Sequence, residues 1–576
     1  MKRNATTTFR CIVQIVLAGA LAVALCSFVP RRCLSNGAHD LYILSTNDIH
    51  GAYFDSSYVG AGSRPSLYSV KTAVDSVRRA VGSRNVILLD AGDYLQGDNA
   101  SYYFNFVDTV SAHIYPRMAS CIGYDAVCVG NHDIEATHRV YDRVRRELKK
   151  RHIPMIAANT PRDRGGNYFD SYKLVRKAGL RVLLLGYENS NMKSWVSPYT
   201  YEGFDFKDLT ACVQGDVDRL SRRTAADVVV VFAHTGVGNG EGTMRESQAL
   251  DVLNSVHGVD FIICAHDHSP VAISRDSVCL VDAGSHCRKL GFAHLHCDVR
   301  KGRVEFSSTE AGIIDLANVP ADPEMSAQFR PDFEAVRDFT LRKIGRTDHD
   351  LRSMESFAGQ CAYMNLIHTV TLERSGADVS LLAPLKFNAV IPEGDLIYND
   401  MFAIYPYENL LAVTRLSGKQ IKDYLEKAYG LWVAEYDGLH ALKIVPNSRG
   451  QWTFAKKSYN FDTAGGLRYT VDITKPVGEK VRIESLADGR PFCQDSLYSV
   501  ATTSYRANGM GWTPESLGME MRSLIYEWIV EKGTVTEELT GKGSVVGEWK
   551  FVPVELSSEA IRSDMKLIVP SDKENR

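Results

Sequence analysis

The sequence predicts an α/β fold, and three observations support this class. From residue 41 to about 310, short apolar runs alternate with amphipathic stretches. The runs have the length of buried strands, and the stretches between them carry apolar residues at helical spacing. The chain, at 576 residues, is too long for one core, so two domains are expected. This alternation predicts layered packing, with reactive groups on the loops that leave the strands.

The elements of the first domain follow in order along the chain. Buried strands are predicted at 41–46, 86–92, 126–130, 154–159, 181–186, 227–234, 260–266 and 278–284. Amphipathic helices are predicted at 65–81 and 138–151. A second unit contains a predicted helix at 417–432 and a predicted strand at 467–473. We see no internal repeat in the sequence.

Changes in composition divide the chain into five segments. A proline-containing stretch followed by a charged helical pattern around 318–345 suits an inter-domain connector. The predicted segments are a signal peptide or N-terminal anchor at 1–36, a first domain at 37–317, a linker helix at 318–349, a second domain at 350–556 and a polar tail at 557–576.

The N-terminus has the pattern of an export signal. Residues 1–10 carry three cations and no acid, and residues 11–29 are apolar apart from Gln14 and Ser27. We therefore expect an exported protein of the periplasm or cell surface. The apolar run is close to the roughly 20 residues that span a bilayer, so retention as a membrane anchor stays open.

Composition excludes some classes of protein. The chain is 45% hydrophobic and 23% charged, with a formal charge of −3. This balance argues against disorder and against a basic protein that binds nucleic acid polymers. Small anionic ligands remain possible because local sites bind them.

Acids, histidines and an asparagine follow five of the predicted strands. Each alone has an ordinary explanation: Asp93 as a turn residue, Asn131 as a helix cap, His234 as a core histidine. Their recurrence at strand ends instead indicates a metal site. The candidate ligands are Asp48, His50, Asp93, Asn131, His234, His266 and His268. Imidazole, carboxylate and amide donors suit Zn, Mn, Fe or Co rather than Ca or Mg. There are too many ligands for one tetrahedral ion, so two divalent ions sharing a carboxylate are expected.

These blocks carry a specific family resemblance. The ordered series "NDIHG", "LDAGD", "GNHDIE", "FAHTG" and "AHDH" resembles the signature of calcineurin-like metallophosphoesterases. With the second unit, residues 40–555 resemble the secreted two-domain 5′-nucleotidase and 2′,3′-cyclic-nucleotide 2′-phosphodiesterase (3′-nucleotidase) family. The resemblance implies a layered α/β/β/α dimetal domain at 37–317 and a smaller α+β substrate-binding domain at 350–556.

The resemblance also implies roles for individual residues. Asp48, His50 and His268 would bind one metal, and Asn131, His234 and His266 the other, with Asp93 bridging the two. His132 resembles the family's catalytic histidine, which stabilises the transition state or protonates the leaving oxygen. Glu135 stands where the 5′-nucleotidases are expected to have the aspartate that orients this histidine.

The second domain of the family supplies aromatic rings that stack on the nucleobase. The matching positions are Phe461 (or Tyr459) and Tyr505, although an aromatic at alternating spacing is also typical of a core. Asn508 is expected to shape the loop beside the ring. Lys386 either faces the substrate phosphate or ribose, or is a solvated loop lysine.

The resemblance implies hydrolysis of a small nucleotide by in-line attack of a metal-bound hydroxide. We expect the protein to be a monomer. The stretches "APLKFN", "TTSYRANG" and "GNHDIE" favour the 2′,3′-cyclic-nucleotide phosphodiesterase and 3′-nucleotidase branch. The first alternative is a 5′-nucleotidase. The second is a non-catalytic surface binding protein on the same scaffold, and the intact set of candidate ligands argues against it.

Overall fold

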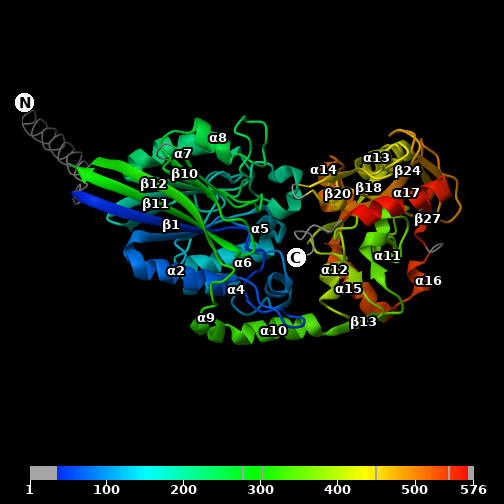
Figure 1. Cartoon of the computed structure of the whole chain (residues 1–576), viewed down its shortest axis with the longest axis horizontal. Coiled ribbons are helices and arrows are strands. Elements are labelled where there is room, and N and C mark those ends of the chain that lie inside the picture. The colour runs from blue at the N-terminus through cyan, green and yellow to red at the C-terminus, as the bar shows by residue number, and fades with distance from the viewer. Residues whose placement is uncertain (1–35, 276–277, 301–302, 448–449, 542–544, 569–576) are drawn as a thin grey trace, which may run out of the picture.

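The structure, a computed structural model, describes residues 36–275, 278–300, 303–447, 450–541 and 545–568 (Figure 1). The predicted signal or anchor therefore lies outside the described residues, apart from its last position. The described chain forms two lobes, with the first domain and the second domain side by side and helices along one edge joining them (Figure 1).

Two mixed sheets form the centre of the first domain. The first sheet has the order β12 (Arg303–Asp315), β11 (Lys289–Arg300), β1 (Gly37–Thr46), β2 (Val86–Asp90), β3 (Ala126–Cys128), β4 (Met155–Ile156). The second has the order β5 (Lys173–Lys177), β6 (Leu180–Tyr187), β7 (Val228–Ala233), β8 (Phe261–Ile263), β10 (Val278–Asp282), β9 (Val271–Arg275). Each of the eight strands predicted from the sequence is present.

The sheets pack face to face, and helices cover their outer faces. Side chains alternate along a strand, so Ile87 and Leu89 enter the core between the sheets while Leu88 faces the helices. The helices on the first sheet are α2 (Leu67–Val81), α4 (Ile114–Ile122) and α6 (Thr137–Lys150), and those on the second are α7 (Leu209–Thr224) and α8 (Ala249–Ser255). The predicted α/β/β/α layering is confirmed.

The connector consists of α9 (Pro323–Gln328) and α10 (Arg330–Leu341), which run along the lower edge of both lobes in Figure 1. Phe329 and Phe333 bury their rings in the core of the first domain. The connector is therefore packed against that domain over much of its length.

The second domain is α+β. Its strands are β13 (Lys343–Thr347), β14 (Leu351–Arg352), β15 (Val379–Leu382), β16 (Val390–Ile391), β17 (Gly394–Ile397), β18 (Leu410–Ser417), β19 (Ile444–Pro446), β20 (Trp452–Phe454), β21 (Thr463–Gly465), β22 (Leu467–Asp472), β23 (Val481–Leu486), β24 (Leu497–Thr503), β25 (Ser516–Glu520), β26 (Thr534–Val535) and β27 (Gly547–Val552). Its helices are α11 (Ala362–Ser375), α12 (Asp400–Ile404), α13 (Gly418–Trp432), α14 (Ser504–Gly509), α15 (Met521–Lys532), α16 (Glu537–Thr540) and α17 (Val554–Leu567). The second domain contains a five-stranded sheet with the order β21-β15-β24-β18-β25.

Two segment boundaries differ from the sequence analysis. Strand β13 lies within the predicted linker but pairs with β17 and β26 of the second domain. Residues 557–567, which the sequence analysis placed in the polar tail, belong to α17, which contacts β27. Ala560 and Ile561 form a buried stripe on that helix, which the surrounding charged residues hide in the sequence.

Candidate functional site

The ends of five strands meet at one rim of the sandwich. Strands β1, β2 and β3 of the first sheet lead into Asp48, Asp93 and Asn131, and β7 and β8 of the second sheet lead into His234 and His266. Parallel strands of both sheets place their carboxyl ends at the same edge, so residues more than 200 positions apart become neighbours.

Asp48, His50 and His268 form the first group of ligand atoms. His268 Nε2 lies 3.4 Å and His50 Nε2 lies 3.8 Å from Asp48 Oδ1. The two Nε2 atoms are 2.9 Å apart. One carboxylate oxygen and two imidazole nitrogens thus converge on a common point.

The second group contains Asp93, Asn131, His234 and His266. His234 Nε2 lies 3.2 Å from Asp93 Oδ2 and 3.1 Å from Asn131 Oδ1. His266 Nδ1 lies 3.2 Å from the same amide oxygen. Asp93 Oδ2 is also 3.9 Å from His50 Nε2, so this carboxylate lies between the two groups, where a bridging ligand is needed.

The backbone at this rim is strained. Asp48, His50, Asp93, His266 and His268 all have φ between 46° and 75°, the left-handed region that residues other than glycine avoid. Such conformations cost about 1–3 kcal/mol each and persist at functional sites when the surroundings enforce them. Here the amides of Asp48 and His50 donate to the carbonyls of Gly92 and Asp93, at 2.9 and 3.0 Å.

The charge at the rim fits divalent cations. Burial raises the pKa of Asp48 and Asp93, but the facing imidazoles outweigh it and hold both pKa values below the usual range. Burial and neighbouring imidazoles lower the pKa of His50 and His266 to about 4, so both rings are neutral and can ligate a metal. Asp48 Oδ1 is buried without a hydrogen-bond partner among the described residues. A bound divalent cation would satisfy this carboxylate oxygen, which faces imidazoles.

His132 stands beside this rim on the short helix α5 (Asn131–Glu135). Its amide donates to Asp93 Oδ1 at 2.9 Å, and its Nδ1 lies 2.8 Å from Glu135 Oε2. Gln96 Nε2 donates to the same Glu135 oxygen at 3.1 Å. Burial lowers the pKa of His132, but Glu135 and Asp93 outweigh it and raise the pKa to about 10. The longer glutamate side chain therefore reaches the histidine.

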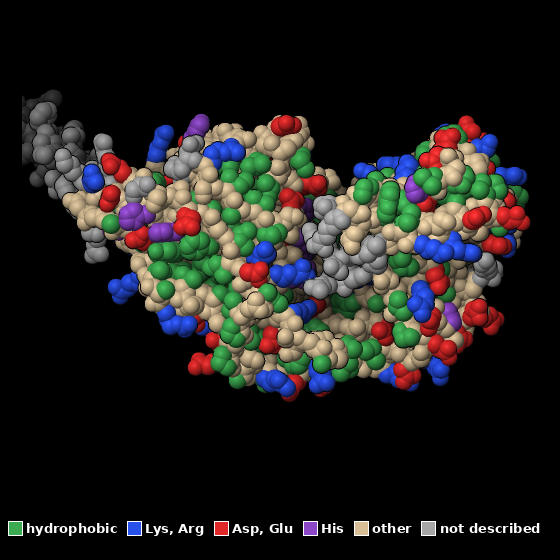
Figure 2. Space-filling view, viewed as in Figure 1, with side chains coloured by type: hydrophobic (Ala, Val, Ile, Leu, Met, Phe, Trp, Pro, Cys, Tyr) green, Lys and Arg blue, Asp and Glu red, His purple; other side chains and the backbone are tan. Residues whose placement is uncertain are grey.

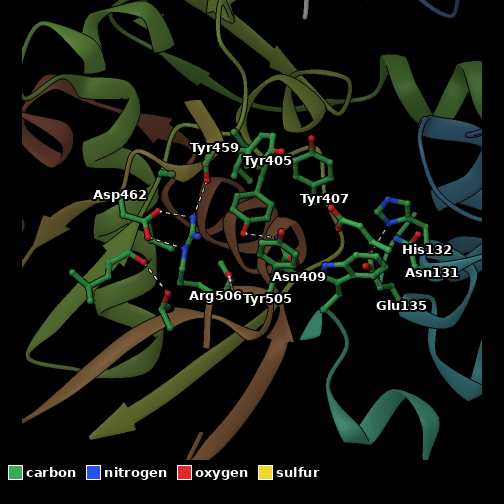
Figure 3. Close-up of a pocket in the computed structure, with 18 of the residues that line it drawn as sticks. Asn131, His132, Glu135, Tyr405, Tyr407, Asn409, Tyr459, Asp462, Tyr505 and Arg506 are labelled. Atoms are coloured by element: carbon green, nitrogen blue, oxygen red, sulfur yellow. Dashed lines mark hydrogen bonds and ion pairs between the residues drawn. The ribbon is translucent and has the colours of Figure 1, made fainter. Parts of the chain in front are cut away.

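A cavity of about 300 Å³ joins this rim to the second domain. Asn131, His132 and Glu135 line one side, and Tyr405, Tyr407, Asn409, Tyr459 and Tyr505 line the other (Figure 3). Arg506 also lines the cavity, but Asp462 Oδ2 lies 2.8 Å from its Nε and the Tyr459 carbonyl accepts a hydrogen bond from Nη2. Tyr459 and Tyr505 thus lie on the wall opposite the metal rim, as one of the two sequence alternatives requires.

Phe461 is not on that wall, which corrects the first sequence alternative. Its ring is 1% exposed and stacks on Trp432 at 5.4 Å between centroids, inside the second-domain core. The turn Ser458–Asn460 directs Tyr459 outward and Phe461 inward. A core aromatic and a stacking aromatic two positions apart look alike in the sequence.

Asn508 and Lys386 do not line the cavity either. The Asn508 carbonyl accepts the amide of Gly511 at 3.0 Å, so this residue shapes the turn after α14. Lys386 is half-buried, and burial lowers its pKa. The expectation that Lys386 faces substrate is therefore unsupported, while its neighbour Leu385 does line the cavity.

Three further residues support the site and escaped the sequence analysis. Trp195 stacks on His266 with centroids 5.0 Å apart. Asp133 accepts the amides of Asp93, Tyr94, Leu95 and Gly130 at 2.8–3.0 Å and so fixes two ligand loops. Gln96 orients Glu135. Of these three residues, only Asp133 could have been found from the sequence, as an acid next to His132 with no assigned role.

Comparison with known proteins agrees with this geometry. Residues 41–270 match the calcineurin-like phosphoesterase family, and residues 343–514 match the 5′-nucleotidase C-terminal domain. The chain contains a calcineurin-like phosphoesterase domain followed by a 5′-nucleotidase C-terminal domain. The second match begins at β13, as the strand pairing does.

Relatives align with most of this chain at low identity. Trifunctional nucleotide phosphoesterase protein YfkN of Bacillus subtilis is 22% identical over 587 residues, covering 89% of this chain and 39% of that longer protein. The 2′,3′-cyclic-nucleotide 2′-phosphodiesterase/3′-nucleotidase of Haemophilus influenzae is 23% identical over 623 residues. This alignment covers 95% of this chain and 92% of that protein. The crystal structure of a protein from Staphylococcus aureus in complex with α-ketoglutarate superimposes on this chain with a TM-score of 0.73 at 17% identity. The alignment covers 89% of this chain and 99% of that protein. This similarity supports the two-domain fold of the chain and, at 17% identity, nothing further.

Proposed function

We propose that this two-domain phosphoesterase hydrolyses small nucleotides, chiefly 2′,3′-cyclic nucleotides and 3′-nucleotides. One observation carries the proposal: a single cavity has a ligand-rich rim with His132 on one side and tyrosines on the other. The rim suits a phosphoryl group, and the rings suit a nucleobase.

Asp48, His50 and His268 would hold one ion and Asn131, His234 and His266 the other, with Asp93 between them. The mixed donors favour Zn, Mn, Fe or Co. Two bound ions would supply an activated water and neutralise charge on the phosphoryl oxygens.

His132 assists the departure of the ribose oxygen in this proposal. Its Nδ1 is held by Glu135, so its Nε2 is the nitrogen available to the cavity. With its pKa raised to about 10 the ring carries a proton at neutral pH. The protonated ring can stabilise negative charge on the leaving oxygen or transfer the proton to it.

The charge of the cavity supports the cyclic-nucleotide branch. Arg506 is the one lysine or arginine among the described residues that line the cavity, and Asp462 already neutralises it. A cyclic phosphodiester carries one negative charge, whereas a 3′- or 5′-monophosphate carries nearly two at neutral pH. The charge therefore favours the cyclic substrate over both monophosphates and does not separate the 3′- from the 5′-monophosphate. The second-domain wall offers little compensation for the extra charge.

The experiment below distinguishes this function from two alternative functions. A 5′-nucleotidase would use the same rim with the ester oxygen of the 5′-position, and the name of the second-domain family favours it. A non-catalytic binding protein would keep the fold without retaining metals.

A substrate panel with and without chelator tests these readings. We expect hydrolysis of 2′,3′-cyclic and 3′-nucleotides, loss with a chelator, and recovery with Mn²⁺ or Zn²⁺. Preference for 5′-nucleotides would establish the first alternative. No hydrolysis and no transition metal by elemental analysis would establish the second.

Location and assembly complete the proposal. We propose export to the periplasm or cell surface, based on the apolar N-terminal segment. Among the described residues, no helix has the length and apolarity needed to cross a membrane. One chain supplies both walls of the cavity, so a monomer is sufficient for activity.

A further inference from the structure

A second group of metal-ligand side chains lies on the first domain, away from the rim. Strands β1 and β11 pair antiparallel, with Asp40 opposite His296 and Tyr42 opposite His294. Directly paired residues project from the same face of a sheet. Asp40, His294 and His296 therefore gather on one outward face. Figure 2 shows purple histidine side chains beside red carboxylates toward the end of the molecule that β11 and β12 reach in Figure 1.

The two imidazoles point at one carboxylate oxygen. His294 Nε2 lies 2.8 Å and His296 Nδ1 lies 2.6 Å from Asp40 Oδ1. All three ligand atoms lie within 4.8 Å of one another. The side chains of Asp40, His294 and His296 are 41%, 25% and 34% exposed, so an ion can enter from solvent.

We propose that Asp40, His294 and His296 bind a third divalent transition-metal ion of the zinc class. Two imidazoles and one carboxylate are three of the four ligands of a tetrahedral zinc site, which leaves one position for water. Metal–ligand bonds of about 2.0–2.1 Å place tetrahedral donors about 3.3 Å apart. Each of the two imidazole nitrogens needs to move away from Asp40 Oδ1 by less than about 1 Å to reach this spacing.

Neighbouring groups favour a cation here. The Tyr42 ring stacks on His294 at 4.3 Å with 2° between the planes, which orients that imidazole. Glu310 of β12 stands opposite His294, and Asp298 lies two residues beyond His296 on the same face. The neighbouring His39 does not belong to this group, because its Nδ1 forms a hydrogen bond with the carbonyl oxygen of Ala178. Oriented ligands and surrounding acids are typical of metal sites.

This site is separate from the catalytic rim. Asp40 stands six positions before Thr46 along the extended strand β1, which corresponds to roughly 20 Å. An ion here would cross-link β1 to β11 near the beginning of the domain and stabilise that pairing. The alternative is a hydrogen-bonded surface cluster with no affinity for metal.

Cobalt binding to the full chain tests the proposal. Metal-stripped protein is titrated with Co²⁺, and bound cobalt is counted by mass spectrometry and followed by its visible absorption. We expect the H294A/H296A variant to bind one Co²⁺ fewer per chain than the wild type, with unchanged phosphodiesterase activity. Asp40→Asn keeps a hydrogen-bond acceptor at nearly the same volume. We expect it to weaken the binding of the same ion at least tenfold.

His257→Ala, at an exposed histidine elsewhere on the domain, is the matched control and should bind as many ions as the wild type. Equal cobalt stoichiometry and affinity in the wild type and H294A/H296A would overturn the proposal. So would loss of the same ion in the His257 variant, because binding would then be non-specific.

Discussion

At the scale of single residues, Glu135 decides how His132 is held. The sequence left open whether a glutamate could replace the expected aspartate. In the structure the carboxylate reaches Nδ1 at 2.8 Å, and Gln96 holds the same oxygen. The additional methylene is accommodated because Glu135 ends the short helix α5, one turn after the histidine.

Replacing Glu135 with glutamine tests this positioning role. The variant loses the negative charge that orients His132 and favours its protonated form. We expect kcat to fall about 10- to 100-fold with KM nearly unchanged, a smaller loss than removal of a general acid causes. Steady-state kinetics on a 2′,3′-cyclic nucleotide measure it.

Glu135→Asp should recover most of kcat, since a carboxylate is retained. An equal fall in the aspartate and glutamine variants would show that side-chain length matters more than charge. Unchanged kcat in Glu135→Gln would rule out the positioning role.

Asp90 gives a pH dependence of stability. This carboxyl is fully buried beside Thr46 and Gly92, and burial raises its pKa to about 8. The native state keeps the proton where the unfolded chain, with an ordinary pKa, has lost it. Stability from this group is therefore complete below about pH 4 and is lost as pH rises toward 8, by up to about 1.4 kcal/mol per pH unit.

Asp90→Asn removes the titration. Its Oδ1 can still accept from the Gly92 amide, and its Nδ2 can donate to Thr46 Oγ1 in place of the bond that the carboxylate accepts. We expect the free energy of unfolding to fall less steeply with pH in the variant than in the wild type between pH 5 and 8. Urea denaturation at several pH values measures it, with the exposed Asp338→Asn as control. Parallel curves for wild type and Asp90→Asn would contradict the prediction.

At the scale of secondary elements, α17 closes the second domain. Ile561 is 2% exposed, and the buried Asp564 accepts the amides of Ala441 and Leu442 at 2.8 Å. The helix thus satisfies backbone groups of the loop at 441–442 while burying its own apolar stripe.

Ile561→Ala should destabilise the protein by about 2–4 kcal/mol, the usual cost of truncating a buried isoleucine. Arg562→Ala, on the exposed side of the same helix, should change stability by less than about 0.5 kcal/mol. Thermal or urea unfolding compares them. Equal stabilities would mean that the chain after 556 is a tail, as the sequence suggested.

At the scale of the whole molecule, both domains line the cavity, so the proposed substrate recognition would depend on both. Tyr459 and Tyr505 are each 37% exposed and lie across the cavity from His132. Neither domain alone presents both a phosphoryl site and aromatic rings. Any change in the relative placement of the domains would therefore alter nucleotide binding before it altered the metal rim.

Tyr459→Ala and Tyr505→Ala should each lower kcat/KM for nucleotides about 5- to 150-fold, equivalent to about 1–3 kcal/mol of stacking. A small aryl phosphate, which lacks a base, should be hydrolysed at the wild-type rate. Phe461→Leu is the matched control: it should reduce stability without changing KM. Unchanged nucleotide kinetics in both tyrosine variants would exclude base stacking.

The sequence by itself determined the layered α/β class and the candidate ligands from Asp48 to His268. Strand periodicity is local, and polar residues at strand ends stand out against apolar runs. Only the tertiary structure decided that Tyr459 faces the cavity and Phe461 the core, that α17 is packed, and that Asp40 meets His294 and His296. These outcomes depend on which faces become buried and which distant strands pair, and neither is encoded in a short stretch of residues.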